Sequence, residues 1–393
     1  MRALVVCPVL PHPPISGGQK RTMRLIEALE RAGARPHLVT ADDAAPEAAE
    51  ALLRRGWQVD VVPEPPATLR RRAAQHLARR PSPHLTGVAE RIRVLAPEAA
   101  LLQLEHTQSA YYSASGLPTI LSLHNLDSRL LARVARSRRP GTPAWAREWN
   151  RALATRSTER REFPRADLVV CVSHEDAEAA ARAGARTLLA PNGVDPEFFD
   201  VEAGGGEGRA AFFGHYGYEP NRRGLEHFLE RGWPEVRRRR PDATLAVAGA
   251  GLAEPLARRF AAHDGVEVLG LVDDVAALLA GVSAVVVPVW EGGGTRLKVL
   301  EALAAARPVA GTAVGVEGIG FVHGREGLVA DDPAGLGDAL ARLLTDREGS
   351  AAMGVAGRRL ADGFRWERAL GELEAAYRGY LDAHRRRSRS ARA

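Results

Sequence analysis

The sequence predicts an α/β protein made of two doubly wound domains, and three observations lead to this prediction. The chain has 393 residues, which is longer than one ordinary α/β domain. Short apolar runs alternate with helical patterns nearly throughout, which is typical of parallel sheets with helices on both faces. A glycine-rich loop joins a strand-like run to a helix twice, near residues 16–20 and 290–296.

Strand-like apolar runs occur in both halves of the chain. In the first half they are residues 3–9, 36–41, 57–63, 100–105, 118–124, 167–173 and 187–193. In the second half they are residues 210–216, 243–249, 266–270, 283–289, 307–312 and 326–331. Each run is short and followed by turn residues or a helical pattern, as expected for parallel strands. Ligands of open parallel sheets bind beyond the carboxyl ends of the strands, where both glycine loops fall.

A break in the alternation marks the domain boundary. Residues 195–208 form a glycine and acid cluster, which we predict to be a linker. The expected domains are residues 1–194 and residues 209–370. A last helix at residues 371–384 is expected to pack back on the first domain, and the arginine and serine tail at residues 385–393 is expected to be disordered.

The charge of the chain argues against a dedicated nucleic-acid binder. Its 54 basic and 48 acidic residues give a net charge of +6, and five tail arginines contribute most of it. The body is close to neutral and lacks a basic face with interleaved aromatics. The two cysteines allow no disulfide framework, and no apolar segment suits a signal peptide or a membrane span. We expect a soluble cytoplasmic protein.

The glycine loop at residues 290–296 opens directly into an amphipathic helix that carries Lys298 and Glu301. The first N–H groups of a helix are unpaired and lie at its positive end, and glycines let a phosphate approach them. Lys298 adds a phosphate ligand, and Glu301 adds an acceptor for ribose hydroxyls. The pattern is equally compatible with a solvated ion pair between these two side chains on an ordinary helix.

The segment GGGTRLKVLEALAAARPVAGTAVGVEGIG resembles the donor-binding signature of family 4 glycosyltransferases of the GT-B fold, in particular the branch with a Gly-Thr-Arg-Leu-Lys motif. Further segments stand in the order expected for this family: SGGQKRT, LHNLDS, CVSHEDAEA, PNGVDPEFF, FFGHYGYEPNRRGLEHF and FRWERALGELEAAY. The resemblance covers nearly the whole chain. It implies two Rossmann-like domains that face a cleft, with a nucleotide-sugar donor bound by the second.

The resemblance implies roles for the main motif. Glu301 matches the glutamate that holds the nucleotide ribose. The loop of Gly294, Thr295 and Arg296 matches the one whose backbone faces the diphosphate. Together with Lys298, these groups would stabilise the charge that grows on the leaving diphosphate.

Two positions after the first strand of the second domain depart from the family pattern. Many relatives grip the pyrophosphate there with an arginine and, several residues later, a lysine. In this chain His215 takes the place of the arginine, and Arg223 that of the lysine, which an arginine replaces through bidentate phosphate contacts. The alternative for Arg222 and Arg223 is a solvated charge at a helix start.

A further departure lies in the glycine loop itself. Relatives commonly carry a glutamate eight positions before the ribose-binding one, where it bonds to donor-sugar hydroxyls, and here this position is Gly293. Glu291 either substitutes for the missing glutamate or is a surface loop residue. The motif therefore does not identify the donor hexose.

In the first domain, the resemblance assigns Gly17 and Gly18 to the glycine pair that closes over the donor phosphate and sugar. His124 matches a histidine that lies near the transferred sugar. Without the resemblance, His124 is interpreted as a strand-end histidine bonded to a backbone carbonyl.

A basic stretch between Arg129 and Arg165 includes Trp145 and Trp149, four positions apart. It predicts either a contact with an anionic membrane or lipid-phosphate acceptor, or a solvated helix whose tryptophans pack on the domain. The chain has no Asp-x-Asp pair of the kind that binds a metal diphosphate, so we expect no metal and no cofactor besides the donor substrate.

The predicted function is transfer of a sugar from a nucleotide diphosphate to an acceptor hydroxyl, with retention of configuration implied by the resemblance. The acceptor is a glycan, a lipid-linked sugar or a small natural product. The residues expected to take part in catalysis are His124, Arg223, Lys298 and Glu301. The alternatives are a sugar-nucleotide epimerase or phosphorylase of the same fold, and a non-catalytic basic binder of membranes or nucleic acid.

Overall fold

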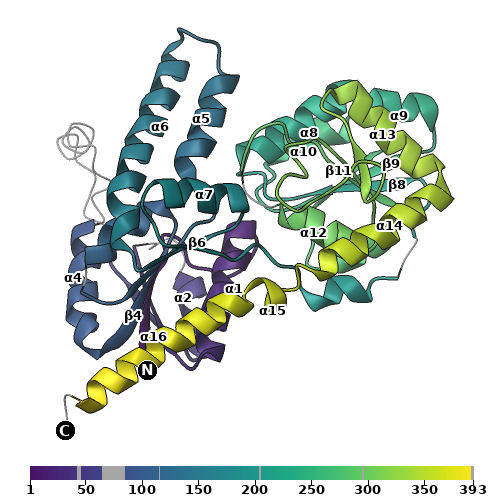
Figure 1. Ribbon diagram of the computed structural model, residues 1–393. Helices are drawn as coiled ribbons and strands as arrows, with labels where there is room; N and C mark the ends of the chain where they lie inside the picture. The colour runs from purple at the N-terminus through teal and green to yellow at the C-terminus, as the bar shows by residue number, and fades with distance from the viewer. Residues whose placement is uncertain (42–45, 64–84, 115, 203–204, 294–295, 391–393) are drawn as a thin grey trace. The chain divides into compact units, whose positions relative to one another are not determined.

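The computed structural model describes residues 1–41, 46–63, 85–114, 116–202, 205–293 and 296–390. The chain forms two units, one of Met1–Pro191 with Leu370–Ala393 and the other of Asn192–Ala369 (Figure 1). Each unit is built on a parallel sheet with helices between its strands. The predicted class of two doubly wound α/β domains is therefore confirmed.

The first unit contains seven parallel strands in the order β3-β2-β1-β4-β5-β6-β7. They are β1 (Arg2–Val6), β2 (Arg35–Thr40), β3 (Gln58–Val61), β4 (Ala99–Glu105), β5 (Thr119–Ser122), β6 (Leu168–Cys171) and β7 (Thr187–Leu189). Its described helices are α1 (Gly17–Arg31), α2 (Pro46–Arg54), α4 (Leu85–Leu95), α5 (Asp127–Ser137), α6 (Pro143–Glu162), α7 (His174–Arg182) and α16 (Gly371–Ser390), with short 3-10 helices η1 (Ala96–Glu98), η2 (Thr107–Ala114) and η3 (Phe163–Arg165). Each strand overlaps the apolar run that predicts it.

Helix α1 begins at the first glycine loop. The Ser16 hydroxyl accepts a hydrogen bond from the Gln19 backbone N–H, and the Gln19 side chain accepts one from the Ser16 N–H, both at 3.2 Å. This capping box satisfies two backbone donors that the helix start leaves without partners. It fixes Gly17 and Gly18 in the first turn of the helix.

The second unit contains six parallel strands in the order β10-β9-β8-β11-β12-β13. They are β8 (Arg209–Phe213), β9 (Thr244–Ala248), β10 (Val266–Gly270), β11 (Ala284–Val287), β12 (Val309–Gly311) and β13 (Gly327–Val329). The described helices are η4 (Pro196–Asp200), α8 (Glu219–Arg231), α9 (Trp233–Arg239), α10 (Glu254–Ala261), α11 (Val275–Ala280), α12 (Leu297–Ala304), α13 (Pro333–Thr345), α14 (Arg347–Asp362) and α15 (Trp366–Ala369). One hydrophobic cluster packs α12 on the sheet, and a second packs α8, α9 and α13.

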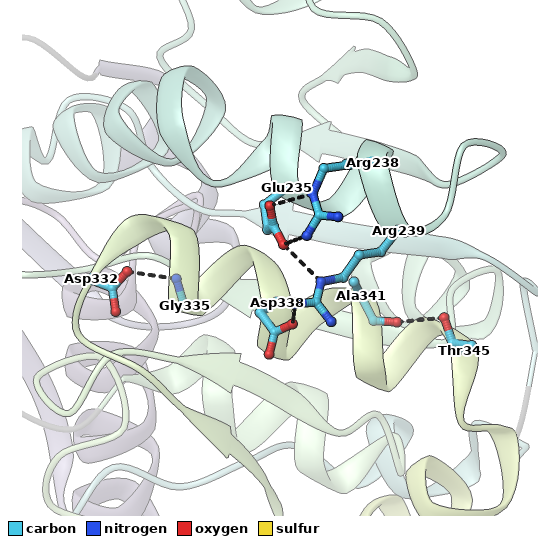
Figure 2. A network of polar contacts seen from close by, with 8 residues as sticks. All are labelled: Glu235, Arg238, Arg239, Asp332, Gly335, Asp338, Ala341 and Thr345. Carbon is cyan, nitrogen blue, oxygen red and sulfur yellow. Dashed lines mark hydrogen bonds and ion pairs between the residues drawn. The ribbon is translucent and has the colours of Figure 1, made fainter.

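Helices α9 and α13 are also joined by polar contacts. Glu235 accepts a hydrogen bond from Arg239 at 2.8 Å, and Arg239 contacts the Asp338 carboxylate at 2.5 Å (Figure 2). Helix α13 starts at a cap in which Asp332 accepts from the Gly335 N–H at 2.7 Å. The ion pairs are partly exposed and contribute little, so buried apolar side chains hold the two helices together.

The segment at residues 195–208 is not the linker that the sequence predicts. Its helix η4 and the buried side chains of Phe198 and Val201 belong to the core of the second unit. Arg307 is 1% exposed and donates a hydrogen bond to the backbone oxygen of Glu202 at 2.8 Å. Two apolar side chains within a glycine and acid run dock the segment, because their burial offsets its flexible composition.

The C-terminal helix is longer than predicted. Residues 385–390, expected to be disordered, continue α16, and residues 391–393 lie outside the described part. The buried side chains of Leu373, Tyr377 and Leu381 lie four positions apart and pack α16 on β4 and α1 of the first unit. Arginine has a high helix propensity, so the helix extends past its docked part.

Helices α5 and α6 lie side by side as a helical hairpin, which contains the basic stretch (Figure 1). The rings of Trp145 and Trp149 pack edge to face with centroids 6.5 Å apart, and the Arg136 guanidinium lies 5.8 Å from the Trp149 ring. The tryptophans thus contact each other within the hairpin. Among the described residues, no helix combines the length and the apolar composition needed to cross a bilayer.

Candidate active site

The neighbouring strands β8 and β11 define where a ligand of the second unit is expected. Strand β8 connects to β9 on one side, and β11 connects to β12 on the other, so the chain order changes direction between them. His215 lies in the loop after β8, and the glycine run lies in the loop after β11. The described donor-binding residues predicted in the second unit therefore gather at the carboxyl edge of its sheet.

Asn221 joins the loop after β8 to helix α12. It lies in the first turn of α8, is 7% exposed, and donates from Nδ2 to the backbone oxygen of His215 at 3.0 Å. Its Oδ1 accepts a hydrogen bond from Lys298 Nζ at 2.9 Å. The ammonium also lies 4.4 Å from the ring centroid of Phe212, near the end of β8. The Lys298 side chain is thus held by α8 and β8 while it projects from α12.

The ammonium of Lys298 has a neutral amide as its polar partner. Burial lowers its pKa to about 7, the charge of Arg296 adds to this shift, and Glu301 opposes it. In the described part of the chain no carboxylate lies within 4.0 Å of the ammonium, so the ion pair with Glu301 considered above does not form. An anion entering this site would gain a charge partner that the protein does not supply. Glu301 itself is 5% exposed, and its contact with a ribose stays a prediction.

Arg296 shapes the end of the glycine loop. Its Nη1 donates to the backbone oxygen of Gly293 at 2.6 Å, while its Nε and Nη2 are buried without a partner among the described residues. Gly292 has a φ of 131°, and a Cβ there would lie 2.5 Å from Arg296 Nη2. Two nitrogens of the guanidinium are thus left without a protein acceptor among the described residues. Gly294 and Thr295 lie outside the described residues.

The adjacent arginines in the first half of α8 have different partners. Arg222 pairs with Glu226 one turn along the helix, at 3.3 Å. Arg223 reaches Glu291 in the loop after β11, at 3.5 Å. Arg223 therefore lies at the glycine loop and Arg222 does not. Glu291 is 23% exposed and paired with Arg223, and its substitution for the glutamate missing at Gly293 stays a prediction.

A pocket of about 370 Å³ lies between α8 and the loop after β11. Its lining residues are Pro220, Arg223, Gly224, Glu226, His227, Glu230, Trp290 and Glu291. The ring of His227 packs edge-on against Trp290 with centroids 5.2 Å apart. Arg223 and Glu291 thus share a concave surface with an aromatic wall.

In the first unit the structure brings Gly18 and His124 together. His124 follows β5, and Gly18 follows Gly17 in the first turn of α1. A Cβ on Gly18 would lie 3.4 Å from His124 Nδ1, so the glycine keeps that side of the ring open. Contact of these residues with a sugar stays a prediction.

The other ring nitrogen of His124 meets a buried acid. Its Nε2 lies 2.9 Å from Oε2 of Glu105, the last residue of β4, which is 0% exposed. The Thr22 hydroxyl lies 3.4 Å from each of these two atoms. Burial lowers the pKa of His124 well below its ordinary value, and Arg21 adds to the shift, so the ring is neutral at pH 7. The partner is a carboxylate and not the backbone carbonyl of the alternative interpretation.

Sequence reasoning missed Glu105, His106 and Asn221. His106 has a φ of 66° and stacks on His124 with ring centroids 3.8 Å apart, and burial lowers its pKa to about 3. The sequence does contain a pattern that marks Glu105 and His106. Both are polar residues at the carboxyl end of an apolar strand, where open sheets bind ligands. No comparable signal marks Asn221, whose partner Lys298 is 77 positions away.

Comparison with known families agrees with this geometry. Residues 15–198 match the model described as Glycosyltransferase Family 4, and residues 207–346 match the model described as Glycosyl transferases group 1. The chain belongs to the family 4, group 1 glycosyltransferases. Its assignment to the Gly-Thr-Arg-Leu-Lys branch of that family stays a prediction.

Solved structures share the fold of this glycosyltransferase. The sucrose-phosphate synthase of Thermosynechococcus elongatus has a TM-score of 0.73 at 18% identity, covering 98% of this chain and 100% of that one. HepE of Anabaena in complex with UDP-glucose has a TM-score of 0.67 at 15% identity, covering 96% and 99%. At these identities the likeness shows the fold alone, and it confirms the predicted GT-B architecture.

A curated relative with a named activity aligns over a shorter stretch. The D-inositol 3-phosphate glycosyltransferase of Streptomyces avermitilis is 34% identical over 153 residues, which are 36% of this chain and 32% of that protein. The chain spans about a third of the length of the curated relatives it matches. This partial match therefore agrees with the family and does not identify the substrate of this chain.

Proposed function

We propose that this glycosyltransferase moves a sugar from a nucleotide-diphosphate donor to an acceptor hydroxyl. One observation carries the proposal. Lys298 lies in the first turn of α12, and its ammonium donates to Asn221 and has no carboxylate partner within the described residues. The unused donors of Arg296 lie at the same helix start. A diphosphate supplies the negative charge that such a site lacks.

The same groups suit the chemistry of the reaction. Negative charge grows on the diphosphate as its bond to the sugar breaks. Lys298 and Arg296 are held in place beforehand, so they stabilise this charge without a cost of rearrangement. Arg223, which pairs with Glu291 at the loop, adds a third cation, and Glu301 accepts hydrogen bonds from the ribose hydroxyls.

The donor nucleotide we infer first is UDP, because HepE, which shares the fold, is solved with UDP-glucose. Retention of configuration is supported by the motif resemblance, and reaction without a divalent metal is supported by the cations of the chain itself. The donor hexose is not part of the proposal, since Gly293 stands where relatives place a sugar-binding glutamate.

We assign the acceptor to the first unit, in which Gly18 and His124 face each other and keep the role near the transferred sugar that the resemblance gives them. A glycan, a lipid-linked sugar or a small natural product each carries the hydroxyl required. The arginines and the tryptophan pair of the α5 and α6 hairpin support a further contact with the inner face of an anionic membrane. Co-flotation with anionic vesicles, but not with neutral ones, is the expected result.

The decisive experiment incubates purified protein with UDP-, GDP- and dTDP-sugars, with and without acceptor alcohols, and measures the products. We expect nucleoside diphosphate release that depends on acceptor and continues when EDTA is present. Lys298→Met is expected to weaken UDP binding at least about 10-fold by calorimetry. Arg258→Met removes a 68% exposed cation of the same unit and serves as the matched control. Formation of a sugar epimer, or absence of nucleotide binding, would reject the proposal.

A further inference from the structure

We propose that Glu105 is a positioning residue, which holds His124 as the tautomer with its hydrogen on Nε2 and leaves Nδ1 as an acceptor for a sugar hydroxyl. The inference rests on the proposed function, because it takes that hydroxyl to belong to the donor or the acceptor. The two ring nitrogens have different surroundings. Nε2 lies 2.9 Å from Glu105 Oε2, whereas Nδ1 faces the space that Gly18 leaves without a side chain.

A chain of buried hydrogen bonds sets the direction of the contact with His124. The hydroxyl of Tyr377 on α16 donates to Gln103 Oε1 at 2.6 Å. That contact turns the Gln103 amide nitrogen toward Glu105, where it donates to Oε1 at 2.6 Å. Burial raises the pKa of Tyr377 far above its ordinary value, so its hydroxyl keeps the hydrogen that it donates. One oxygen of Glu105 therefore accepts from Gln103, and the other accepts from the Nε2–H of His124.

The carboxylate form of Glu105 is the form that fits this chain. Burial raises its pKa, and the hydrogen bond from Gln103, the charge of Arg21 and the Thr22 hydroxyl oppose the shift. Arg21 is 1% exposed and brings a guanidinium from α1 into the same buried region. The charged and titratable groups around Glu105 are Arg21 of α1, Cys7 after β1, His106 and His124 at the sheet edge, and Tyr377 of α16.

The ring of His124 is held in one orientation by its neighbours. His106 stacks on it at a centroid distance of 3.8 Å and an interplanar angle of 29°. The left-handed backbone of His106, with a φ of 66°, places this ring directly at the end of β4. If the His124 ring turned over, Nε2 would lose Glu105. His106 thus supports the face of the ring and Glu105 its edge. A side chain that positions a substrate requires such a fixed orientation.

The tautomer is measurable without any substrate. We would record 15N NMR spectra of histidine-labelled full-length protein at pH 7 and assign the His124 signals by comparison with His124→Asn. The expected result is the Nε2–H tautomer. A Nδ1–H tautomer, or a protonated ring, would overturn the inference.

Glu105→Gln tests the positioning role. Gln103 keeps the oxygen of the new amide on its side, so the new NH2 group faces His124 Nε2 and drives the ring to the Nδ1–H tautomer. We expect kcat for sugar transfer from the active donor to fall about 10- to 100-fold, because Nδ1 no longer accepts. The KM for the donor and the Kd for UDP are expected to stay within about threefold. A reversed tautomer with an unchanged kcat would overturn the inference.

Tyr377→Phe is the milder variant, for which we expect a mixture of tautomers and a smaller loss of kcat. Tyr111→Phe is its matched control, since it removes a hydroxyl that bonds Thr158 at 2.7 Å in the same unit. Identical spectra for both folded variants would contradict the role of Tyr377. Failure of the proposed function would appear as absent UDP binding with the expected tautomer, whereas failure of this inference would appear as the wrong tautomer in an active enzyme.

Discussion

Lys298 Nζ donates to Asn221 Oδ1 across 2.9 Å, and this bond joins two helices that lie 77 positions apart in the sequence. The asparagine also binds the backbone of the loop after β8 through His215. A neutral amide therefore positions the cation, and it does so without cancelling the charge. A carboxylate in its place would neutralise the ammonium and remove the attraction for a phosphate.

This relationship predicts that Asn221→Asp weakens the binding of UDP. The new carboxylate pairs with Lys298 and repels the diphosphate, so we expect the Kd to rise at least about 10-fold at low salt. Isothermal titration calorimetry measures the change. Asn150→Asp makes the same exchange at an exposed position of α6 in the first unit and is expected to leave the Kd unchanged. Equal affinity of wild type and Asn221→Asp would contradict the role given to Lys298.

UDP binding is expected to weaken as the pH rises through 7. The Lys298 ammonium has a pKa of about 7 in the unliganded protein, and a bound diphosphate raises it because it favours the charged form. Binding at pH 8 therefore takes up protons, approaching about one per site. Calorimetry in two buffers of different ionisation enthalpy measures this uptake. Lys298→Met should abolish it, and wild-type binding without uptake would count against the site.

The same pKa predicts a stability difference of defined sign. A lysine in the unfolded chain has a pKa of about 10.4, above the folded value of about 7. Between these values the unfolded chain binds more protons, so the free energy of unfolding rises with pH. Relative to Lys298→Met, the wild type should gain stability from pH 7 to pH 9 in urea titrations. A gain shown by the variant instead would refute the pKa assignment.

Gly18→Ala is expected to separate stability from activity. Alanine favours a helix by about 0.5–1 kcal/mol over glycine, so the first turn of α1 should not lose stability. Its Cβ would stand 3.4 Å from His124 Nδ1 and occupy the side on which the proposed sugar binds. We expect an unchanged or raised Tm with a reduced rate of transfer. Gly379→Ala, on α16 with nothing within 4 Å, is the control, and full activity of Gly18→Ala would contradict the proposed site.

A truncation and a substitution should distinguish the docked part of α16 from its end. Removal of residues 385–393 takes away only exposed positions among those described, so stability should change by less than about 0.5 kcal/mol. Tyr377→Ala removes a fully buried ring and should cost about 3 kcal/mol. Urea titrations of both proteins measure this. Equal stability would show that α16 does not support the first unit.

Much of the architecture follows from local patterns. Every strand of both sheets overlaps an apolar run, because a strand covered by helices on both faces is apolar at nearly every position. Helix α1 begins at the first glycine pair and α12 begins just after the second glycine loop, and the sequence already shows both. The same patterns misjudged residues 195–208 and 385–390. The glycine and acid run predicts no core residues, yet Phe198 is buried. The arginine tail predicts no helix, yet residues 385–390 are helical.

The candidate site divides in the same way. The residues alone predict Lys298, which follows a glycine loop at the edge where open sheets bind ligands, whereas the roles of Arg296 and His124 are implied by the family resemblance. Folding alone decides what holds them: Asn221 for Lys298, and Glu105 with Gln103 and Tyr377 for His124. The bond between Tyr377 and Gln103 spans 274 positions. Hydrophobic periodicity acts between neighbours in the chain, whereas hydrogen-bond partners so far apart are chosen only when the packed sheets and helices bring them within about 3 Å.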